Sequence, residues 1–505
     1  MTVAYRHPVT APTETDVFNA ICAAAGGHWP TPRSQRAPSR SRGIGEPEHL
    51  ISLSLPLPPL DLIAALVDLQ ADGHEFYWEN PGLAEGLAAT GCVAQWTGKG
   101  PARFEHGQEI TEDWLNHTHA IGLATASGTH VLCRFTFDDG TRERPIQHRQ
   151  PWPPAPAAHL HVPRWQVSQQ RAIYRFTANV RLSEVSHPST VKAVCKTIWQ
   201  RYSSLRQLAM LPQIELPHLR PQVRRVPTPT RQQHQQFLHS VASLLEAIER
   251  RRLVKVVLAS TIDLTSRSPF SAVTALRMLR HSYSGCHIFA TRCGEQLFLG
   301  ASPERLFRIR QQQLSTNAIA GSSPRGNTAA ADRKLGEALR RSDKELHEHR
   351  IVADFIVGQL RQLGLQPSWS SRPEILRLAN IQHLHTPLTA AVPADIHPLQ
   401  IVASLHPTPA MAGLPQQAAC DAIAEHEPFE RSLYAAPLGW INQQRESEFI
   451  VGIRSALIDD TRIRLYAGAG IVRGSVPNRE WTEINMKLQA IASVLSLSDS
   501  LTLAP

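Results

Sequence analysis

The order of helical and strand patterns after residue 231 limits the possible folds of this chain more than any other feature. Apolar residues recur at helical spacing after Thr230, a capping residue, and the run "LVKVVLAS" at 253–260 then reads as a buried strand. Two further helices are expected at about 332–363 and 478–495, and two further strands at about 448–458 and 462–467. Because helices and strands mix without a regular βαβ alternation, the sequence predicts an α+β fold.

The composition along the chain suggests three regions. Residues 1–45 are rich in Pro, Ser and Arg and are expected to be poorly ordered. Residues 46–230 contain a strand candidate, "HVLCRFTF", and a predicted helix near 190–210, and they end in the proline-containing stretch "RPQVRRVPTPT". The mixed pattern described above then occupies residues 231–495.

The composition also excludes several classes of protein. Seven cysteines without a CxxC motif do not indicate a disulfide framework, and the start of the chain has no apolar signal-peptide core. The most apolar stretch, "LISLSLPLPPLDLIAALVDL", contains three prolines and Asp61 and is not a membrane span. The net charge of +9 is spread thinly, without aromatic residues between the basic clusters. We therefore expect a cytoplasmic protein that binds neither nucleic acid nor membranes.

The stretch "ASPERLF" at 301–307 places a glutamate directly after a proline. The preceding "EQLFLG" resembles a strand entering a core, and Pro303 cannot donate a hydrogen bond to a sheet. Glu304 is therefore expected at a strand-end turn, where a rigid scaffold can present a working side chain.

Four glutamates occur in two pairs with helical i, i+3 spacing: Glu345 with Glu348, and Glu480 with Glu483. Each pair shares one helix face, which on its own is most often a solvated face. Two pairs on separate helices can also converge on one hard cation such as Mg²⁺. Zinc is not expected from "HEH", because histidines two residues apart point to different sides of a helix.

Lys255 interrupts the apolar run of the predicted strand. It is either a lysine at the strand entrance with its ammonium group in water, or a desolvated lysine that acts as a base. The glycines of "YAGAGIVRG" are spaced GxGxxxG and are followed by Pro477, so this segment is not read as a dinucleotide loop.

Ten short motifs in a fixed order resemble the chorismate-utilising enzymes, the family that includes anthranilate, aminodeoxychorismate, isochorismate and salicylate synthases. They cover about residues 233–490: "KVVLA", "FLGASPERLF", "AIAGS", "KELHEH", "IQHL", "LHPTPA", "YAAPLGW", "GIRSA", "GAGIV" and "EWTEINMK". Upstream, "FYWENP" is similar to the N-terminal regions of isochorismate synthases. The resemblance implies a large mixed fold of antiparallel sheets flanked by helices.

The resemblance also implies roles for the residues above. Glu304 matches the acid that protonates the departing C4 hydroxyl of chorismate, and Lys255 matches the base that activates water for attack at C2. Glu348 and Glu483 match the principal Mg²⁺ ligands, supported by Glu345 and Glu480 through the waters of the metal. An acid that holds its proton near neutral pH requires burial to raise the pKa of Glu304.

Further residues match the substrate-binding positions of the family. Arg454 and Tyr434 match the residues that hold the enolpyruvyl carboxylate. The other positions expected around the ring and its carboxylate are Gly321, Ser322, His383, Ala410, Gly468, Gly470 and Lys487. Tyr434 and His383 have an equally simple alternative, as packed and hydrogen-bonded residues.

The resemblance favours an isochorismate synthase that uses Mg²⁺ and takes chorismate as its substrate without an obligate protein partner. Salicylate and anthranilate synthases usually carry threonine where this chain has Ala410. The alternatives are a salicylate synthase, which adds pyruvate elimination, and a catalytically silent relative that binds chorismate. Two departures from the family pattern are Ser260, where arginine is usual, and Ala436, where glycine is common. The use of the product, in menaquinone, siderophore or salicylate synthesis, stays open.

Overall fold

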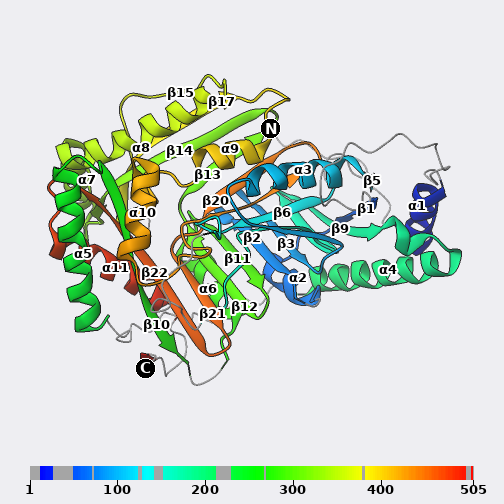
Figure 1. The fold of residues 1–505 in the computed structure, drawn as a ribbon. Helices are drawn as coiled ribbons and strands as arrows, with labels where there is room; N and C mark the ends of the chain where they lie inside the picture. Colours follow the sequence, from blue (N-terminus) through cyan, green and yellow to red (C-terminus); the bar gives the residue numbers. More distant parts are fainter. Residues whose placement is uncertain are drawn as a thin grey trace.

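The computed structural model describes residues 12–26, 49–70, 73–122, 128–141, 152–211, 229–266, 269–377, 381–495 and 502–503. Two large sheets form the framework of these residues, and helices lie against them (Figure 1). Nearly all strand pairs are antiparallel; the pair of the first and fifth strands is parallel. The predicted α+β fold is therefore confirmed.

The first sheet has thirteen strands. Their bounds are β1 (Leu50–Leu57), β2 (Glu75–Asn80), β3 (Glu85–Thr90), β5 (Thr118–Gly122), β8 (Trp165–Gln170), β9 (Ile173–Arg181), β10 (Lys255–Thr265), β11 (His287–Cys293), β12 (Gln296–Ser302), β18 (Gly413–Leu414), β21 (Ser455–Asp459), β22 (Arg462–Val472) and β23 (Thr502–Leu503). The order across the sheet is β18-β10-β22-β21-β12-β11-β2-β3-β8-β9-β1-β5, and β23 pairs with β10.

The second sheet has ten strands. Their bounds are β4 (Ala94–Gly98), β6 (His130–Phe135), β7 (Ala158–Val162), β13 (Arg305–Arg310), β14 (Gln313–Pro324), β15 (Ser368–Trp369), β16 (Glu374–Arg377), β17 (Ile381–Ala391), β19 (Pro437–Asn442) and β20 (Ser447–Val451). The order is β15-β17-β14-β13-β20-β19-β6-β7-β4, and β16 pairs with β17.

The helices flank these sheets. Their bounds are α1 (Glu14–Gly26), α2 (Leu62–Asp68), α3 (Arg103–Asn116), α4 (Pro188–Met210), α5 (Arg231–Glu249), α6 (Ala272–Ser282), α7 (Ala329–Arg341), α8 (Asp343–Gln362), α9 (Pro398–Leu405), α10 (Gln416–His426) and α11 (Pro477–Leu495), with short 3₁₀ turns η1 (Pro81–Leu83) and η3 (Leu182–Val185). As predicted, Thr230 caps α5, and its side chain accepts a hydrogen bond from the backbone N–H of Gln233.

Two predicted elements are each divided in the structure. The helix expected at 332–363 is two helices, because Ser342 ends α7 and caps α8 by accepting a hydrogen bond from the Glu345 N–H at 3.4 Å. The strand expected at 448–458 is β20 and β21. The chain turns between them, where Arg454 has a φ of 50° that a strand does not permit.

The division into three regions stays a prediction. Within residues 1–45, α1 packs on α4 with Val17 and Ile21 buried, which differs from the poor order expected there; residues 1–11 and 27–45 lie outside the described residues. Strands from either side of residue 230 pair directly, β2 with β11 and β6 with β19. The two sheets therefore cross the predicted boundary at 230, which stays a prediction.

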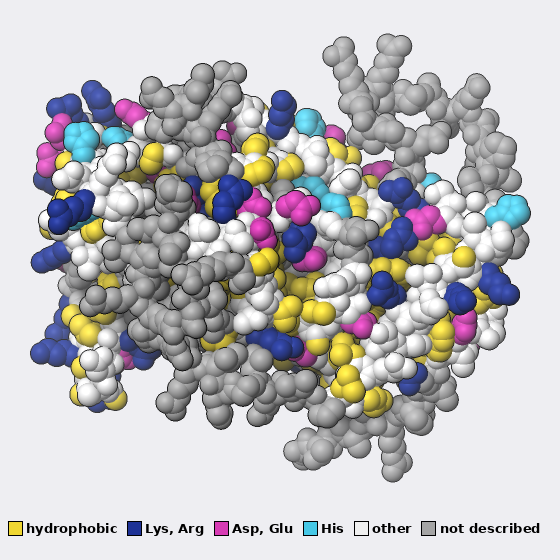
Figure 2. Space-filling view, turned by 90° about the horizontal axis from the view of Figure 1, so that it is seen from below, with side chains coloured by type: hydrophobic (Ala, Val, Ile, Leu, Met, Phe, Trp, Pro, Cys, Tyr) yellow, Lys and Arg dark blue, Asp and Glu magenta, His cyan; other side chains and the backbone are white. Residues whose placement is uncertain are grey.

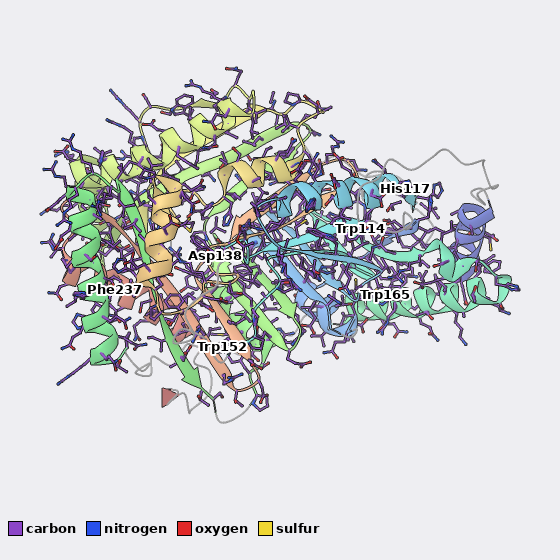
Figure 3. All side chains as sticks on the ribbon, viewed as in Figure 1. Trp114, His117, Asp138, Trp152, Trp165 and Phe237 are labelled. Carbon is purple, nitrogen blue, oxygen red and sulfur yellow. The ribbon has the colours of Figure 1, made fainter. Side chains whose placement is uncertain are left out.

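Packed side chains fill the space between the sheets and the helices (Figure 3). For example, Phe237 on α5 lies 5.2 Å from Trp481 on α11, and Trp165 on β8 stacks on Phe176 on β9, measured between ring centroids. On the face drawn in Figure 2, the Lys and Arg side chains are dispersed over the surface rather than gathered in one patch. Among the described helices, none combines the length and apolar character that crossing a membrane requires.

Candidate active site

A cavity with about 870 Å³ of empty space, part of it open to solvent, lies where the two sheets meet α8 and α11. All the predicted catalytic and substrate-binding residues line it, together with two of the predicted metal ligands: Lys255, Glu304, Gly321, Ser322, His383, Ala410, Tyr434, Arg454, Gly468, Gly470, Lys487, Glu348 and Glu483. Segments more than 200 residues apart in the chain thus contribute to one site.

Glu304 lies at the point where the chain crosses from one sheet to the other. It follows β12 of the first sheet and immediately precedes β13 of the second, so the predicted strand-end turn is confirmed. Its backbone N–H donates to the Ser302 hydroxyl at 3.2 Å, and its carbonyl accepts from the Val451 N–H at 3.0 Å. These bonds hold the backbone of Glu304 while its side chain faces the cavity.

Burial changes the acidity of Glu304. Loss of solvent around the carboxyl raises its pKa from 4.5 to about 7, although the positive charges of Lys255, Lys487 and Arg454 lower it. The expected direction of this shift is therefore confirmed, and a protonated carboxyl is present in the cavity near neutral pH.

Lys255 is the first residue of β10 and is 1% exposed. Its ammonium group donates to Glu348 Oε1 at 2.8 Å, so it is not a surface lysine with its charge in water. Gly470 on the neighbouring β22 leaves room for this ion pair. A Cβ there would lie 2.6 Å from Glu348 Oε1 and 3.2 Å from Lys255 Cε, which is too close for a side chain.

The two glutamate pairs lie in the first two turns of α8 and α11, on helices as their spacing predicts. Glu348 and Glu483 face the cavity, whereas Glu345 and Glu480 lie outside its lining. Burial and the neighbouring Glu348 carboxylate raise the pKa of Glu345, and burial also raises the pKa of Glu480. Glu483 also contributes to the raised pKa of Glu345 and of Glu480, so the four carboxylates form one electrostatically coupled acidic cluster.

Three lysines pair with this cluster. Besides the contact of Lys255 with Glu348, Lys487 Nζ lies 2.8 Å from Glu483 Oε1, and Lys344 Nζ lies 3.2 Å from Glu480 Oε1. Burial opposes ionisation of Glu483, but Lys487 outweighs it and lowers the pKa of Glu483. Lys487 also donates to the Gly468 carbonyl at 2.7 Å, which fixes its position at the cavity wall.

His383 and Arg454 form a polar wall of the cavity. His383 Nδ1 lies 3.1 Å from the Ser322 hydroxyl and 3.3 Å from the Gly321 carbonyl, while Arg454 Nη2 lies 3.5 Å from His383 Nε2. Burial and the charge of Arg454 lower the pKa of His383 to about 3, so the ring is neutral. His383 is therefore both a hydrogen-bonded residue and a residue of the cavity wall.

Tyr434 stacks on Tyr466 with ring centroids 4.9 Å apart, and burial raises the pKa of its hydroxyl. Gly468 allows this hydroxyl close, because a Cβ there would lie 3.1 Å from Tyr434 Oη. In the following turn the left-handed conformation falls on Ala435, with φ of 59°, and Ala436 is fully buried. The alanine at 436 therefore occupies a position that does not require glycine.

Ser260 lies on β10 five residues after Lys255, so its side chain points to the opposite face of the strand. This departure from the family pattern therefore lies away from the cavity.

Arg431 and Glu427 are cavity-supporting residues that the sequence reasoning missed. Arg431 is fully buried and donates to Glu427 Oε2 at 2.9 Å and to the carbonyls of Met411 and Val257, both at 2.8 Å. Glu427 Oε1 in turn accepts from the Ala259 N–H at 2.7 Å. The i, i+4 spacing of the pair was visible in the sequence, but it does not reveal burial beside β10.

Comparisons with known proteins agree with this geometry. The family described as "Chorismate binding enzyme" matches residues 38–496. The chain is 32% identical over 486 residues to the "Salicylate biosynthesis isochorismate synthase" of Pseudomonas aeruginosa, covering 93% of this chain and 95% of that protein. It is 39% identical over 280 residues to "Isochorismate synthase MenF" of Escherichia coli, covering 54% of this chain and 63% of that protein.

Solved structures with the same fold include the menaquinone-specific isochorismate synthase MenF from Escherichia coli, with a TM-score of 0.71 at 26% identity, covering 95% of this chain and 99% of that one. Anthranilate synthase component I from Streptococcus pneumoniae has a TM-score of 0.61 at 16% identity, covering 81% and 92%. The second likeness concerns the fold alone.

Proposed function

The chain belongs to the family of chorismate binding enzymes, and we propose that it is an isochorismate synthase, an isomerase that converts chorismate to isochorismate with Mg²⁺. The observation that carries the proposal is the gathering of Lys255, Glu304, Glu348 and Glu483 around one cavity. A base, an acid and a cation site are what an exchange of hydroxyl groups on a dianionic substrate requires.

In the proposed reaction, water adds at C2 of chorismate while the hydroxyl group at C4 leaves. Lys255, as the neutral amine, takes a proton from the attacking water, and a C2–O bond forms. The ring double bonds shift, the C4–O bond breaks, and Glu304 gives its proton to the departing hydroxide. One water enters and one leaves, so the reaction is an isomerisation. The proton on Lys255 then returns to Glu304 through solvent before the next turnover.

The burial of Glu304 supports its role, because a pKa of about 7 keeps about half of the carboxyl groups protonated at neutral pH. The contact with Glu348 Oε1 at 2.8 Å supports the role of Lys255, because it holds the Lys255 Nζ at the cavity.

Mg²⁺ would be held by Glu348 and Glu483, with Glu345 and Glu480 behind them. When bound, it supplies positive charge for the carboxylate on the ring of chorismate. The donor set fits this ion in its chemistry, because carboxylate oxygens are its preferred protein ligands.

The remaining residues of the cavity anchor the substrate. We assign the enolpyruvyl carboxylate to Arg454, which is held beside the neutral ring of His383, and to the buried hydroxyl of Tyr434. Lys487 and Gly470 lie beside the glutamates of the cavity. Gly321 and Gly468 line the cavity next to His383 and Tyr434. Ala410 places a methyl group at the cavity, where the lyase-competent relatives are expected to have a hydroxyl.

The experiment incubates purified protein with chorismate and Mg²⁺ and separates the products by chromatography. We expect isochorismate as the product, no pyruvate, and loss of turnover in excess EDTA that added Mg²⁺ restores. Pyruvate as the main product would favour the salicylate synthase alternative, and full turnover in EDTA would contradict the metal site. No turnover under any of these conditions would favour the silent relative.

A further inference from the structure

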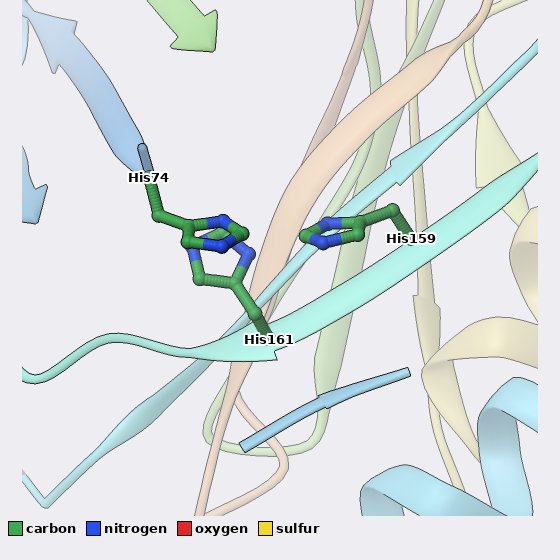
Figure 4. A group of neighbouring side chains, drawn as sticks. All are labelled: His74, His159 and His161. Carbon is green, nitrogen blue, oxygen red and sulfur yellow. The ribbon is translucent and has the colours of Figure 1, made fainter. Parts of the chain in front are cut away.

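Three histidines lie together away from the chorismate cavity. His74 precedes β2, and His159 and His161 lie on β7. One ring nitrogen from each lies within 4.8 Å of the others, and Figure 4 shows the three rings turned toward one common space. None of the three lines the chorismate cavity.

The local sequence places two of the three histidines on one face. His159 and His161 are two residues apart on a strand, so both side chains point to the same face of the second sheet. His74 comes from the segment that leads into β2 of the first sheet. The ring centroids are 5.1 Å apart for His159 and His161, and 5.6 Å and 5.3 Å from His74 to each of them.

One nitrogen of each ring in the cluster lacks a partner among the described residues. Each of the three rings has a buried Nδ1 without a hydrogen-bond partner among the described residues. His159 and His161 are only 3% and 2% exposed. An unpaired polar atom in the interior costs free energy that a bound ligand would recover.

The cluster is made of neutral imidazoles. Burial, together with Arg134, lowers the pKa of His159 to about 2, and burial lowers the pKa of His161 well below its usual value. A neutral imidazole keeps a lone pair that can bind a metal ion without first losing a proton.

Arg134 is the feature that opposes a cation here. It lies on β6 directly opposite His159, and its charge would repel a bound ion. However, its guanidinium group is directed toward β11, where it donates to the Thr291 hydroxyl at 3.2 Å and to the Arg292 carbonyl. The positive charge of Arg134 therefore lies beside the histidine cluster and is partly balanced by its hydrogen bonds to these two oxygens.

We propose that His74, His159 and His161 form a second metal site, for a divalent transition metal ion of the Zn²⁺ type. Three imidazoles and one open position are a usual ligand set for such an ion, whereas Mg²⁺ prefers carboxylates. Zn–N bonds of about 2.0–2.1 Å require the ligand atoms to lie roughly 3.3 Å apart, so side-chain movements of about an ångström would close the site. The ion would join the lead-in of β2 to β7, and thus the first sheet to the second.

The test uses Co²⁺ and Zn²⁺ as probes on the full chain, with saturating Mg²⁺ present to occupy the acidic cluster. Tetrahedral Co²⁺ at nitrogen ligands gives strong visible absorption bands, whereas six-coordinate Co²⁺ at carboxylates gives weak ones. The variant is His74→Gln, because His74 is only half-buried and its replacement leaves the core intact. His281→Gln is the matched control, since His281 is exposed on α6.

We expect one equivalent of tetrahedral Co²⁺, displaced by Zn²⁺, in the unmodified protein and in His281→Gln. The affinity of His74→Gln for Co²⁺ should fall by more than about 10–100-fold. That range is typical of removing a residue that only hydrogen-bonds to a metal ligand, so the loss of a ligand itself should exceed it. Zn²⁺ should also raise the thermal unfolding temperature, because only the folded chain brings the three histidines together and so binds the ion more tightly. His159→Gln should behave like His74→Gln in both measurements.

Absence of the tetrahedral spectrum, or equal affinity in His74→Gln and His281→Gln, would overturn the proposal. The double variant Glu348→Gln with Glu483→Gln separates the two metal sites. It should keep the tetrahedral spectrum while losing Mg²⁺-dependent turnover, and His74→Gln should show the reverse. Loss of the spectrum in the double variant would place the Co²⁺ in the chorismate cavity and refute a histidine site.

Discussion

The replacement Glu304→Gln tests the acid role most directly, because it removes the proton but keeps the shape of the side chain. The pKa of Glu304 is about 7, compared with 4.5 for an ordinary glutamate. At pH 7 the shift raises the protonated fraction from roughly 0.3% to about half, a gain of roughly 150-fold in competent enzyme. Most of the protonated Glu304 at pH 7 is therefore due to the burial of its carboxyl group.

We expect kcat/KM of the unmodified enzyme to fall about tenfold per pH unit above pH 7, as Glu304 loses its proton. Glu304→Gln should lower kcat by about 10²–10⁴-fold, the usual contribution of one general acid, with little change in KM. It should also abolish this alkaline decline. The control Glu337→Gln alters an exposed glutamate on α7 and should change neither the rate nor the profile.

The assay is steady-state kinetics with saturating Mg²⁺ between pH 5.5 and 9, roughly two units on either side of the expected pKa. A single-turnover measurement at each pH separates chemistry from product release. If Glu304→Gln loses less than about tenfold in kcat, or keeps the same alkaline decline, Glu304 is not the acid.

The same shift predicts a pH dependence of stability. The folded-state pKa lies above the unfolded-state value, so the folded chain binds the proton more tightly between pH 4.5 and about 7. The free energy of unfolding therefore falls by up to about 3 kcal/mol as the pH rises through this range. Urea unfolding should show Glu304→Gln becoming more stable relative to the unmodified chain over the same range. Parallel pH profiles would contradict the burial argument.

Three further predictions concern the surroundings of the acid. Lys255→Met should lower kcat by about 10²–10⁴-fold, and combining it with Glu304→Gln should add little, because both act in one displacement; additive losses in single-turnover kinetics would argue against a concerted step. Gly470→Ala should cost about 1–3 kcal/mol in urea unfolding and most of the activity, because the new methyl group meets Glu348 and Lys255; an unchanged kcat would contradict that contact. Arg431→Met should destabilise the protein by about 3–5 kcal/mol, because it leaves its glutamate partner charged and buried; a loss below about 1 kcal/mol in urea unfolding, typical of a surface pair, would refute this.

Local sequence determined much of the framework of this protein. The helical spacing after Thr230, the buried strand that follows it and the two i, i+3 glutamate pairs depend on contacts between residues close in the chain, and the structure contains all of them. The turn at Pro303 and Glu304 was predictable for the same reason, since a proline interrupts a strand by its own covalent geometry. Motif order then identified the family.

Other features were decided by tertiary structure, because they depend on residues that are far apart in the chain. The pairing of Lys255 with Glu348, across 93 positions, changes a strand-entrance lysine into a buried ion pair. The burial of Arg431 and the meeting of His74 with β7 have no local signature either. Local sequence could place Glu304 at a turn, but its raised pKa depends on how completely the two sheets exclude water around it. Burial is a property of the whole packed molecule, so only the folded chain could determine it.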